Sequence, residues 1–308
     1  MEFPDGVYTV LVTPFDYDGN IDYESYDKLI DKQVESNITG IFLHGTTSES
    51  PTIILEEKLE IVHHVHKRVH GRKKIIVGVG GNNTSEVLVF AKFCVPYCNG
   101  MMVTVPNYNK PSQEGIYQHF CTICMNDELC NVPFVLYNIP SRCGVNMEPE
   151  TIARVFDNCS NVLAIKEASG SMDQVMKIKS LCNIKIFAGD DALLLPMMAL
   201  GGSGLISVVG NILPNEIHLV WALCNKNNYN DARILFYSFY DLIKVLFIES
   251  NPVPTKYILH AYGFINSDHM RLPLYHITDE DKLNIIKNAY ENALIKFKEF
   301  NLIYIRFI

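Results

Sequence analysis

Eight short apolar runs, each followed by a turn and a stretch with the period of an amphipathic helix, succeed one another along the chain. Each run is nearly continuous in valine, isoleucine and other apolar residues, whereas a half-exposed strand alternates apolar and polar residues. Continuous apolar strands are typical of parallel sheets that are covered on both faces. The runs predict strands at Val7–Thr13, Gly40–His44, Lys74–Val79, Gly100–Val105, Pro133–Asn138, Val162–Lys166, Lys185–Ala188 and Gly204–Val208.

The stretches between these runs predict helices at 22–37, 53–70, 84–95, 112–129, 149–158, 171–181, 190–200 and 214–226. Eight strand–helix units in about 220 residues are the number that closes a (β/α)8 barrel, or TIM barrel. A doubly wound sheet is the alternative, but the units follow one another without a break in composition, which favours closure. We therefore expect an α/β fold in which residues 1–226 form the barrel and carry the active site.

The rest of the chain, residues 227–308, has only helical patterns, which predict helices at Asp231–Glu249, Pro254–Tyr262 and Asp279–Phe300. No linker rich in proline, glycine or serine precedes these patterns, so we expect a C-terminal helical appendage packed on the barrel rather than an independent domain. Residues 301–308 are unusually apolar for the end of a chain, and we expect them to pack against another surface.

Composition and charge exclude several classes of protein. The 308 residues carry a formal net charge of −8 and no basic block, which argues against nucleic-acid binding. A hydrophobic fraction of 48% excludes a disordered chain. The most apolar stretch, 192–210, is interrupted by Pro196 and three glycines, so it predicts a buried helix and strand rather than a membrane span.

Cysteine usage and the first residues bear on location and on metal binding. Nine cysteines, an odd number, and a start without a basic or apolar segment predict free thiols, no secretory signal and a cytoplasmic location. Cys121 and Cys124 form a Cys-x-x-Cys pair, but no second ligand pair accompanies it. We therefore predict no metal site.

Polar side chains gather where the predicted strands end, and the carboxyl ends of the strands are where a (β/α)8 barrel carries its active site. Lys166 ends the sixth strand, where burying an ammonium group is unfavourable. One interpretation is an amine whose pKa is lowered by burial, so that it attacks a ketone and forms a Schiff base. The other is a lysine that pairs with Glu167 at the rim of the barrel. Position alone favours neither interpretation.

The other polar strand ends also allow two interpretations each. Thr46 and Thr47 either cap the next helix or hold a small carboxylate together with free backbone N–H groups. Tyr108 and Tyr137 are either ordinary aromatic residues at the rim or parts of a hydroxyl relay that supplies the proton transfers of imine formation. Arg142 either forms a surface ion pair or grips a carboxylate at two points.

Five longer motifs carry a resemblance to a known family. They are GTTSES at 45–50, YNKPSQEG at 108–115, LYNIPSRCG at 136–144, IKEA at 165–168 and NPVPTK at 251–256. Over residues 6–278 the chain resembles the dihydrodipicolinate synthase/N-acetylneuraminate lyase family of class I aldolase-type barrels. Within that family, Arg142 and the NPVPTK segment resemble the dihydrodipicolinate synthase branch specifically.

The resemblance implies roles for the residues that bind the substrates. Lys166 would form the Schiff base with pyruvate, and Thr47 would hold the pyruvate carboxylate. Arg142 would bind the carboxylate of aspartate semialdehyde. Gly189 and Ile206 would shape the pyruvate pocket.

The resemblance also implies a proton relay and an assembly. Thr46, Tyr108 and Tyr137 would form the relay, with Tyr108 reaching into the site of the neighbouring subunit. The implied assembly is a homotetramer built as a dimer of tight dimers. No metal or organic cofactor is implied, because the imine at Lys166 is itself the electron sink.

The implied reaction is the condensation of pyruvate with L-aspartate 4-semialdehyde to 4-hydroxy-tetrahydrodipicolinate, in the diaminopimelate route of lysine synthesis. The first alternative is another pyruvate-dependent aldolase of the same family, which acts on N-acetylneuraminate, a 2-keto-3-deoxy sugar acid or 4-hydroxy-2-oxoglutarate. Arg142 argues against this alternative, because a polyol gains little from a guanidinium group. The second alternative is a catalytically silent barrel that serves as a binding module, against which stands the presence of every proposed catalytic group.

Two positions depart from the pattern of the family. Ser48 stands where a glycine is common, and a serine would strain the loop if that position has positive φ. Asn107 replaces a tyrosine that is common in the bacterial enzymes. Asn107 also belongs to a set of positions that align with the allosteric site of lysine-inhibited relatives: Pro51, Leu55, Lys58, Asn82, Glu86 and Asn107. Leu55 and Lys58 replace histidines there, and Lys58 would repel the cationic side chain of lysine, so we predict weak or absent inhibition.

Overall fold

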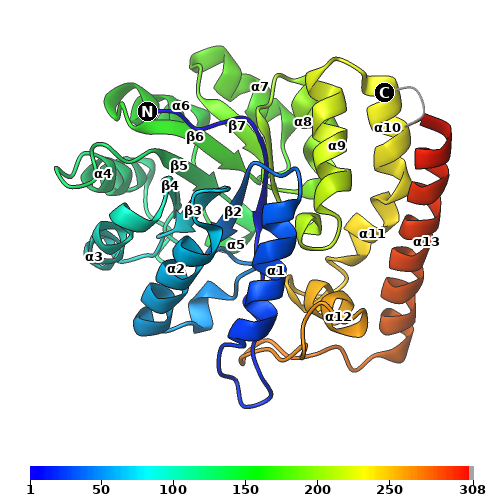
Figure 1. Ribbon diagram of the computed structural model, residues 1–308. Helices are drawn as coiled ribbons and strands as arrows, with labels where there is room; N and C mark the ends of the chain where they lie inside the picture. Colours follow the sequence, from blue (N-terminus) through cyan, green and yellow to red (C-terminus); the bar gives the residue numbers. More distant parts are fainter. Residues whose placement is uncertain (305–308) are drawn as a thin grey trace.

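The computed structural model describes residues 1–304, and eight parallel strands close into a barrel at its centre (Figure 1). The strands pair in chain order, and β8 pairs with β1 to close the ring. This confirms the predicted (β/α)8 barrel. The strands are β1 (Gly6–Val10), β2 (Gly40–Leu43), β3 (Lys74–Gly78), β4 (Gly100–Thr104), β5 (Phe134–Asn138), β6 (Val162–Glu167), β7 (Lys185–Ala188) and β8 (Gly204–Ser207).

The helices of the barrel region follow the strands in sequence. They are α1 (Tyr23–Glu35), α2 (Leu55–Val69), α3 (Thr84–Cys94), α4 (Gln113–Cys124), α5 (Pro140–Cys143), α6 (Pro149–Asn158), α7 (Met172–Leu181), α8 (Leu194–Ala199) and α9 (Pro214–Asn225), with short 3-10 helices at Ser50–Thr52, Val95–Tyr97, Asp191–Leu193 and Val209–Asn211. The helix predicted at 112–129 ends at Cys124 instead. There the side-chain amide of Asn161 donates to the carbonyl oxygens of Cys124 and Leu129, at 2.8 and 3.1 Å, and so satisfies groups left open at the helix end.

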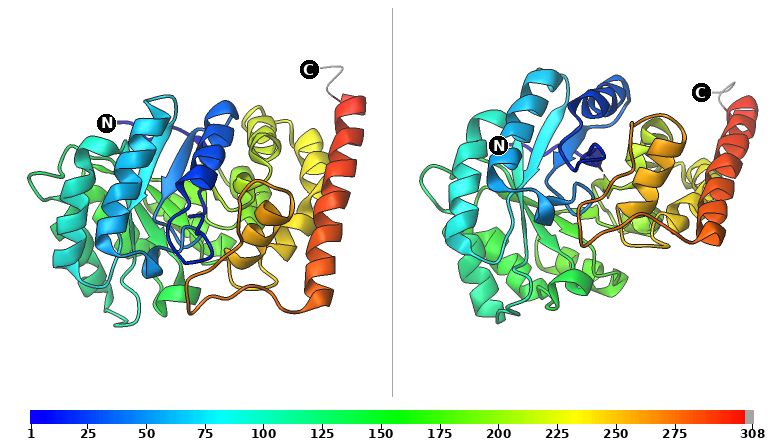
Figure 2. Two further views of the ribbon diagram at one scale, coloured as in Figure 1. Left: turned by 60° about the horizontal axis from the view of Figure 1, so that its bottom comes forward. Right: turned by 90° about the horizontal axis from the view of Figure 1, so that it is seen from below.

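Four further helices, α10 (Tyr229–Ser238), α11 (Tyr240–Val245), α12 (Val253–Ala261) and α13 (Glu280–Tyr304), lie on one side of the barrel. Both views in Figure 2 place α13 at the outer edge, where it contacts α10, α11 and α12. The helix predicted at Asp231–Glu249 is two helices. The helical backbone is interrupted at Phe239, whose side chain is buried in the core. The expected packing of residues 301–308 concerns side chains outside those that the structure describes.

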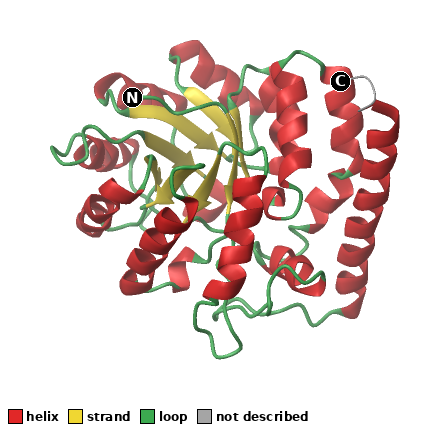
Figure 3. Cartoon of the chain, in the orientation of Figure 1, coloured by secondary structure: helices red, strands yellow, loops and turns green. Residues whose placement is uncertain are grey.

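Figure 3 shows the strands surrounded by helices. The core has two layers, one inside the barrel and one between the strands and these helices. Because successive side chains of a strand point to opposite faces, each strand contributes to both layers. On β6, Ala164 faces the interior and Ile165 faces the helices. The interior cluster consists of Phe3, Tyr8, Val10, Phe42, Ile76, Met102, Val135, Tyr137, Ala164, Phe187 and Ile206. Within residues 1–304, no helix has the length and apolar character that a bilayer crossing requires.

Candidate active site

Lys166 lies near the carboxyl end of β6, two residues after the interior-facing Ala164, so its side chain also points into the barrel. The residue is only 7% exposed. Burial lowers the pKa of its ammonium group to about 8; the buried Asp191 raises this pKa, and Arg142 lowers it. A pKa in this range leaves a substantial fraction of neutral amine near neutral pH, which is the nucleophilic form.

Glu167 follows Lys166 and faces the opposite side of the strand. Its carboxylate accepts hydrogen bonds from the Asn138 amide at 3.1 Å, the Gln174 amide at 3.0 Å and the Ser169 backbone N–H at 2.7 Å. In the described part of the chain, no ion pair joins Glu167 to Lys166. The interpretation of Lys166 as one half of a rim ion pair with Glu167 is therefore not supported.

Tyr137 lies beside Lys166 because the two residues are partners in the register of β5 and β6. The Lys166 Nζ atom lies 4.4 Å from the centroid of the Tyr137 ring. Burial raises the pKa of the Tyr137 phenol far above its usual value, against smaller opposing effects of Arg142 and Thr46. The phenol is therefore protonated at neutral pH and can donate a hydrogen bond. The structure places Lys166 and Thr46 beside Tyr137, and a proton relay through these residues stays a prediction.

Thr46 and Thr47 belong to the loop that follows β2, which two other segments of the chain hold in place. Thr47 is buried, and the Asn251 side-chain Nδ2 donates to its Oγ1 at 2.9 Å. Ser48 donates from its Oγ to the carbonyl oxygen of Leu11 at 2.7 Å, and its own carbonyl oxygen accepts from the Thr13 hydroxyl at 2.9 Å. The left-handed residues of this loop are His44, with φ of 55°, and Glu49, with φ of 56°, and not Ser48. Ser48 therefore carries no backbone strain from a positive φ, and its two hydrogen bonds stabilise the loop.

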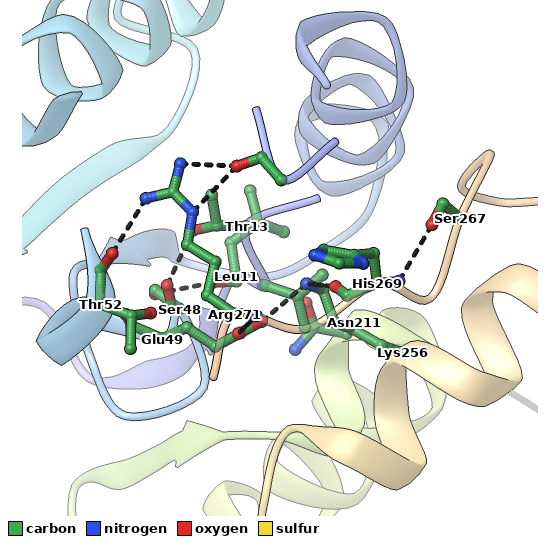
Figure 4. A network of polar contacts seen from close by, with 12 residues as sticks. Leu11, Thr13, Ser48, Glu49, Thr52, Asn211, Lys256, Ser267, His269 and Arg271 are labelled. Atoms are coloured by element: carbon green, nitrogen blue, oxygen red, sulfur yellow. Dashed lines mark hydrogen bonds and ion pairs between the residues drawn. The ribbon is translucent and has the colours of Figure 1, made fainter. Parts of the chain in front are cut away.

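Glu49 anchors the same loop through charged groups (Figure 4). Its carboxylate pairs with the Lys256 ammonium at 2.6 Å, and both side chains are 0% exposed. Lys256 also donates to the carbonyl oxygen of His269 at 2.7 Å. The backbone N–H of Arg271 donates to the second Glu49 oxygen at 3.3 Å. The sequence motif NPVPTK therefore meets the motif GTTSES at two points, Asn251 with Thr47 and Lys256 with Glu49.

A cavity of about 480 Å³ opens beside this loop. Its walls include Thr46, Tyr137 and Arg142, so the last of these, on the short helix α5, faces the same space as the two hydroxyl groups. Arg142 is exposed, which leaves its guanidinium group accessible to a ligand in the cavity. Arg142 and Tyr137 therefore lie where one ligand can contact both.

Gly189 and Ile206 lie at neighbouring strand ends. Ile206 is buried in the interior cluster that also contains Tyr137. Gly189 follows β7, and a Cβ atom at this position would lie 2.6 Å from the Cβ of Ala168, so only glycine fits. Their assignment to a pyruvate pocket stays a prediction.

Asp191 is a residue that sequence reasoning did not assign to the site. Its carboxylate is buried, accepts from the Ser207 hydroxyl at 2.5 Å and from the Val208 N–H at 2.9 Å, and its electrostatic effect reaches Lys166. Burial raises the pKa of Asp191 to about 6. The position of two consecutive aspartates at the end of the seventh strand was the signal that could have identified it.

Tyr108 is not brought to the other site residues within this chain. Its side chain is 87% exposed, on a loop in which it adopts a left-handed φ of 65°. An exposed phenol in a backbone conformation that is unusual for a non-glycine residue fits a role outside its own barrel, and this remains a prediction.

The positions aligned with an allosteric site line two adjacent cavities. The larger one, of about 720 Å³, has Pro51, Leu55, Lys58, Asn82 and Glu86 in its walls, while Asn107 lines the cavity that also holds Arg142. Lys58 is half-buried, and burial lowers the pKa of its ammonium group.

Fold and site together define the class of this protein: it is a (β/α)8-barrel enzyme with a buried amine at the carboxyl end of the barrel. A sequence model of the dihydrodipicolinate synthetase family matches residues 3–291. The chain belongs to the dihydrodipicolinate synthetase family.

Individual relatives agree with this assignment. The chain is 40% identical over 293 residues to the 4-hydroxy-tetrahydrodipicolinate synthase of Endomicrobium trichonymphae, covering 94% of this chain and 99% of the relative. The solved 4-hydroxy-tetrahydrodipicolinate synthase of Methylacidiphilum fumariolicum has a TM-score of 0.93 at 35% identity, over 96% of this chain and 98% of the other. The dihydrodipicolinate synthase of Cyanidioschyzon merolae, solved with lysine bound, has a TM-score of 0.90 at 34% identity, over 94% and 98%.

Proposed function

We propose that this chain condenses pyruvate with L-aspartate 4-semialdehyde to 4-hydroxy-tetrahydrodipicolinate, in the diaminopimelate route of lysine synthesis. The observation that carries the proposal is the buried Lys166 amine beside the Tyr137 phenol inside the barrel. Family membership supports the same reaction, because relatives at about 40% identity carry the name of this synthase. All nine cysteines are free thiols, which suits the reducing cytoplasm where we place the enzyme.

The chemistry begins with the neutral Lys166 amine. It attacks the C2 carbonyl carbon of pyruvate, the resulting carbinolamine loses water, and a protonated imine forms. The imine withdraws electrons from the pyruvate methyl group, which loses a proton and becomes an enamine. The enamine carbon attacks the aldehyde carbon, and the new alkoxide takes up a proton. The amino group of the aspartate-derived part then attacks the imine carbon, the ring closes, and the bond to Lys166 breaks.

These steps need proton transfers and two carboxylate-binding groups. Tyr137 and Thr46 line the same cavity, and Tyr137 lies beside Lys166. We assign the proton transfers to these two hydroxyl groups and to Tyr108 of a neighbouring subunit. We assign the pyruvate carboxylate to Thr47 and the aspartate semialdehyde carboxylate to Arg142. Gly189 and Ile206 would bound the pyruvate pocket. The exposure of Tyr108 leaves its side chain free to reach a neighbouring subunit. The assembly that we propose is a homotetramer built as a dimer of tight dimers.

Substrate selection separates this function from the alternative of a sugar-acid aldolase. The test measures turnover with pyruvate plus L-aspartate 4-semialdehyde, N-acetylneuraminate cleavage, and condensation of pyruvate with sugar aldehydes. The proposal expects the first reaction to exceed the others by at least about 100-fold in kcat/KM, because a sugar substrate leaves the Arg142 guanidinium group without the carboxylate that it binds. Equal or greater turnover of a sugar acid would replace the proposed function by the alternative.

Arg142→Ala is expected to raise the KM for L-aspartate 4-semialdehyde by about tenfold or more, because charge-assisted hydrogen bonds to the substrate carboxylate are lost. The KM for pyruvate is expected to change far less. Steady-state kinetics with each substrate varied in turn measure both values. Arg154→Ala is the matched control, since Arg154 is exposed on α6 and pairs with Glu114. An equal rise of both KM values would contradict the assigned role of Arg142.

Lysine is expected to inhibit weakly or not at all, with no half-inhibition below about 1 mM, because the half-buried Lys58 ammonium repels the side chain of lysine in this cavity. A coupled assay over a lysine titration measures this. Lys58→His removes most of the repulsion at neutral pH and is expected to increase sensitivity. Half-inhibition of the unmodified enzyme at micromolar lysine would show that Lys58 does not exclude the ligand.

A further inference from the structure

The contact between Asn251 and Thr47 joins the segment before α12 to the loop after β2, 204 residues apart in sequence. Both residues are almost fully buried, at 7% and 2% exposure. The Asn251 Nδ2 atom donates to the Thr47 Oγ1 atom at 2.9 Å. A contact of this length in a buried setting fixes the direction in which each partner can make its remaining hydrogen bonds.

A hydroxyl group has one hydrogen to donate and two lone pairs with which to accept. Because the Asn251 amide occupies a lone pair of Thr47, the Thr47 oxygen acts as acceptor in this contact and its single hydrogen stays available. Among the hydrogen bonds of residues 1–304, the Thr47 hydroxyl hydrogen has no acceptor. The remaining atom of the amide, Asn251 Oδ1, is buried without a partner. No other bond therefore competes for the donor that Thr47 presents.

The loop does not need Asn251 for its anchorage. The Glu49–Lys256 ion pair and the two hydrogen bonds of Ser48 hold the two residues that directly follow Thr47 (Figure 4). A buried carbonyl oxygen without a partner also reduces stability, so a purely structural role would favour an apolar side chain at this position. The Asn251 amide thus orients the Thr47 hydroxyl group rather than anchoring the loop.

We propose that Asn251 is a positioning residue which forces Thr47 to accept from the amide and so reserves the Thr47 hydroxyl hydrogen for the carboxylate of the bound 2-oxo acid. This inference rests on the proposed function, in which Thr47 holds the pyruvate carboxylate. A charged acceptor and a correctly oriented hydroxyl donor form a stronger hydrogen bond than two neutral groups. Pyruvate binding therefore depends on the polarity of the residue behind Thr47, and not only on its size.

Asn251→Asp reverses the polarity with almost no change in shape. A carboxylate only accepts, so Thr47 must turn its hydrogen towards residue 251 and can no longer donate to the substrate. We expect the KM for pyruvate to rise at least about tenfold, with a smaller change in kcat and no change in the KM for L-aspartate 4-semialdehyde. Asn251→Ala leaves Thr47 its hydrogen without direction, and we expect a rise of only about two- to threefold.

Which of the two variants raises the KM for pyruvate more distinguishes a role of Asn251 in polarity from a role in packing. If Asn251 served only to fill space, the alanine variant would be the worse one, because it leaves a cavity, whereas the nearly isosteric aspartate would be mild. Asn288→Asp, at an exposed position of α13, controls for the added negative charge on the molecule. Thermal unfolding of each variant shows whether the folded state is intact.

A double-mutant cycle with Thr47→Val isolates the hydroxyl from simple repulsion between the new carboxylate and the substrate. In the valine background, Asn251→Asp is expected to raise the KM for pyruvate by less than about threefold. An effect that stays the same with and without the Thr47 hydroxyl would overturn the proposal. An unchanged KM in Asn251→Asp would also overturn it, provided that the unmodified enzyme forms a pyruvate adduct. If no such adduct forms, the proposed function itself fails.

Discussion

Turnover is expected to fall at least about 10³-fold when Lys166 is replaced by arginine, because the reaction loses its nucleophile. Arginine keeps a positive charge near this position, but its guanidinium group stays protonated at all relevant pH values and forms no imine with a ketone. Steady-state assays with pyruvate and L-aspartate 4-semialdehyde measure the loss. Lys226→Arg, at an exposed position after α9, is the matched control and should leave turnover unchanged.

The same lysine gives this prediction a pH dependence. Burial lowers the pKa of Lys166 to about 8, so about a tenth of the amine is neutral at pH 7, compared with roughly 3 in 10,000 for an ordinary lysine. The rate of imine formation with pyruvate should rise with pH through a midpoint near 8, because the Lys166 ammonium group loses its proton around this pH. Borohydride quenching at successive times and pH values measures this rate. A midpoint near the ordinary lysine value, or an Arg variant with more than a tenth of normal turnover, would contradict the role of Lys166.

Lys256→Met is expected to lower the free energy of unfolding by about 3–5 kcal/mol, because it leaves the Glu49 carboxylate buried without its counter-charge. Both side chains of this pair are 0% exposed, and the two charged atoms lie 2.6 Å apart. The Lys256 ammonium also lies 4.4 Å from the centroid of the Phe15 ring, so little water reaches the pair. Removing one partner is therefore far more unfavourable than removing an exposed ion pair.

Chemical denaturation followed by circular dichroism measures the change. Lys244→Met, at an exposed position of α11, is the matched control and should alter the unfolding free energy by less than about 0.5 kcal/mol. The double variant Lys256→Met with Glu49→Gln should be more stable than Lys256→Met alone, because the unpaired charge is gone. An unfolding midpoint for Lys256→Met equal to that of the unmodified protein would show that the pair contributes little.

Most of the fold could be predicted because its information is local. A continuous apolar run marks each buried strand in the sequence, and the number of these runs predicts a closed barrel. The errors lie where tertiary contacts end or divide a helix. The side-chain amide of Asn161 ends α4 at Cys124, and the buried Phe239 separates α10 from α11. Asn126 and Asp127 are a local turn signal after α4, and the Asn126 side chain accepts from the Glu128 N–H at 3.2 Å. No such turn residue stands at Phe239.

The candidate site likewise combines residues that local sequence predicts with contacts that it does not predict. Lys166 and Tyr137 were predictable as strand ends, and the register of β5 and β6 makes them neighbours. The contacts of Asn251 with Thr47 and of Lys256 with Glu49 were not, because they join segments more than 200 residues apart. Their motifs were visible in the sequence, but periodicity carries no information about which distant segments meet.

The central claim is that Lys166 forms a covalent imine with pyruvate, and trapping that imine tests it most directly. The protein is incubated with pyruvate, reduced with borohydride, digested and examined by mass spectrometry. We predict one added reduced pyruvate unit per chain, on the peptide that contains Lys166, and none in Lys166→Arg. An unmodified chain, or an adduct confined to a different lysine, would contradict the account.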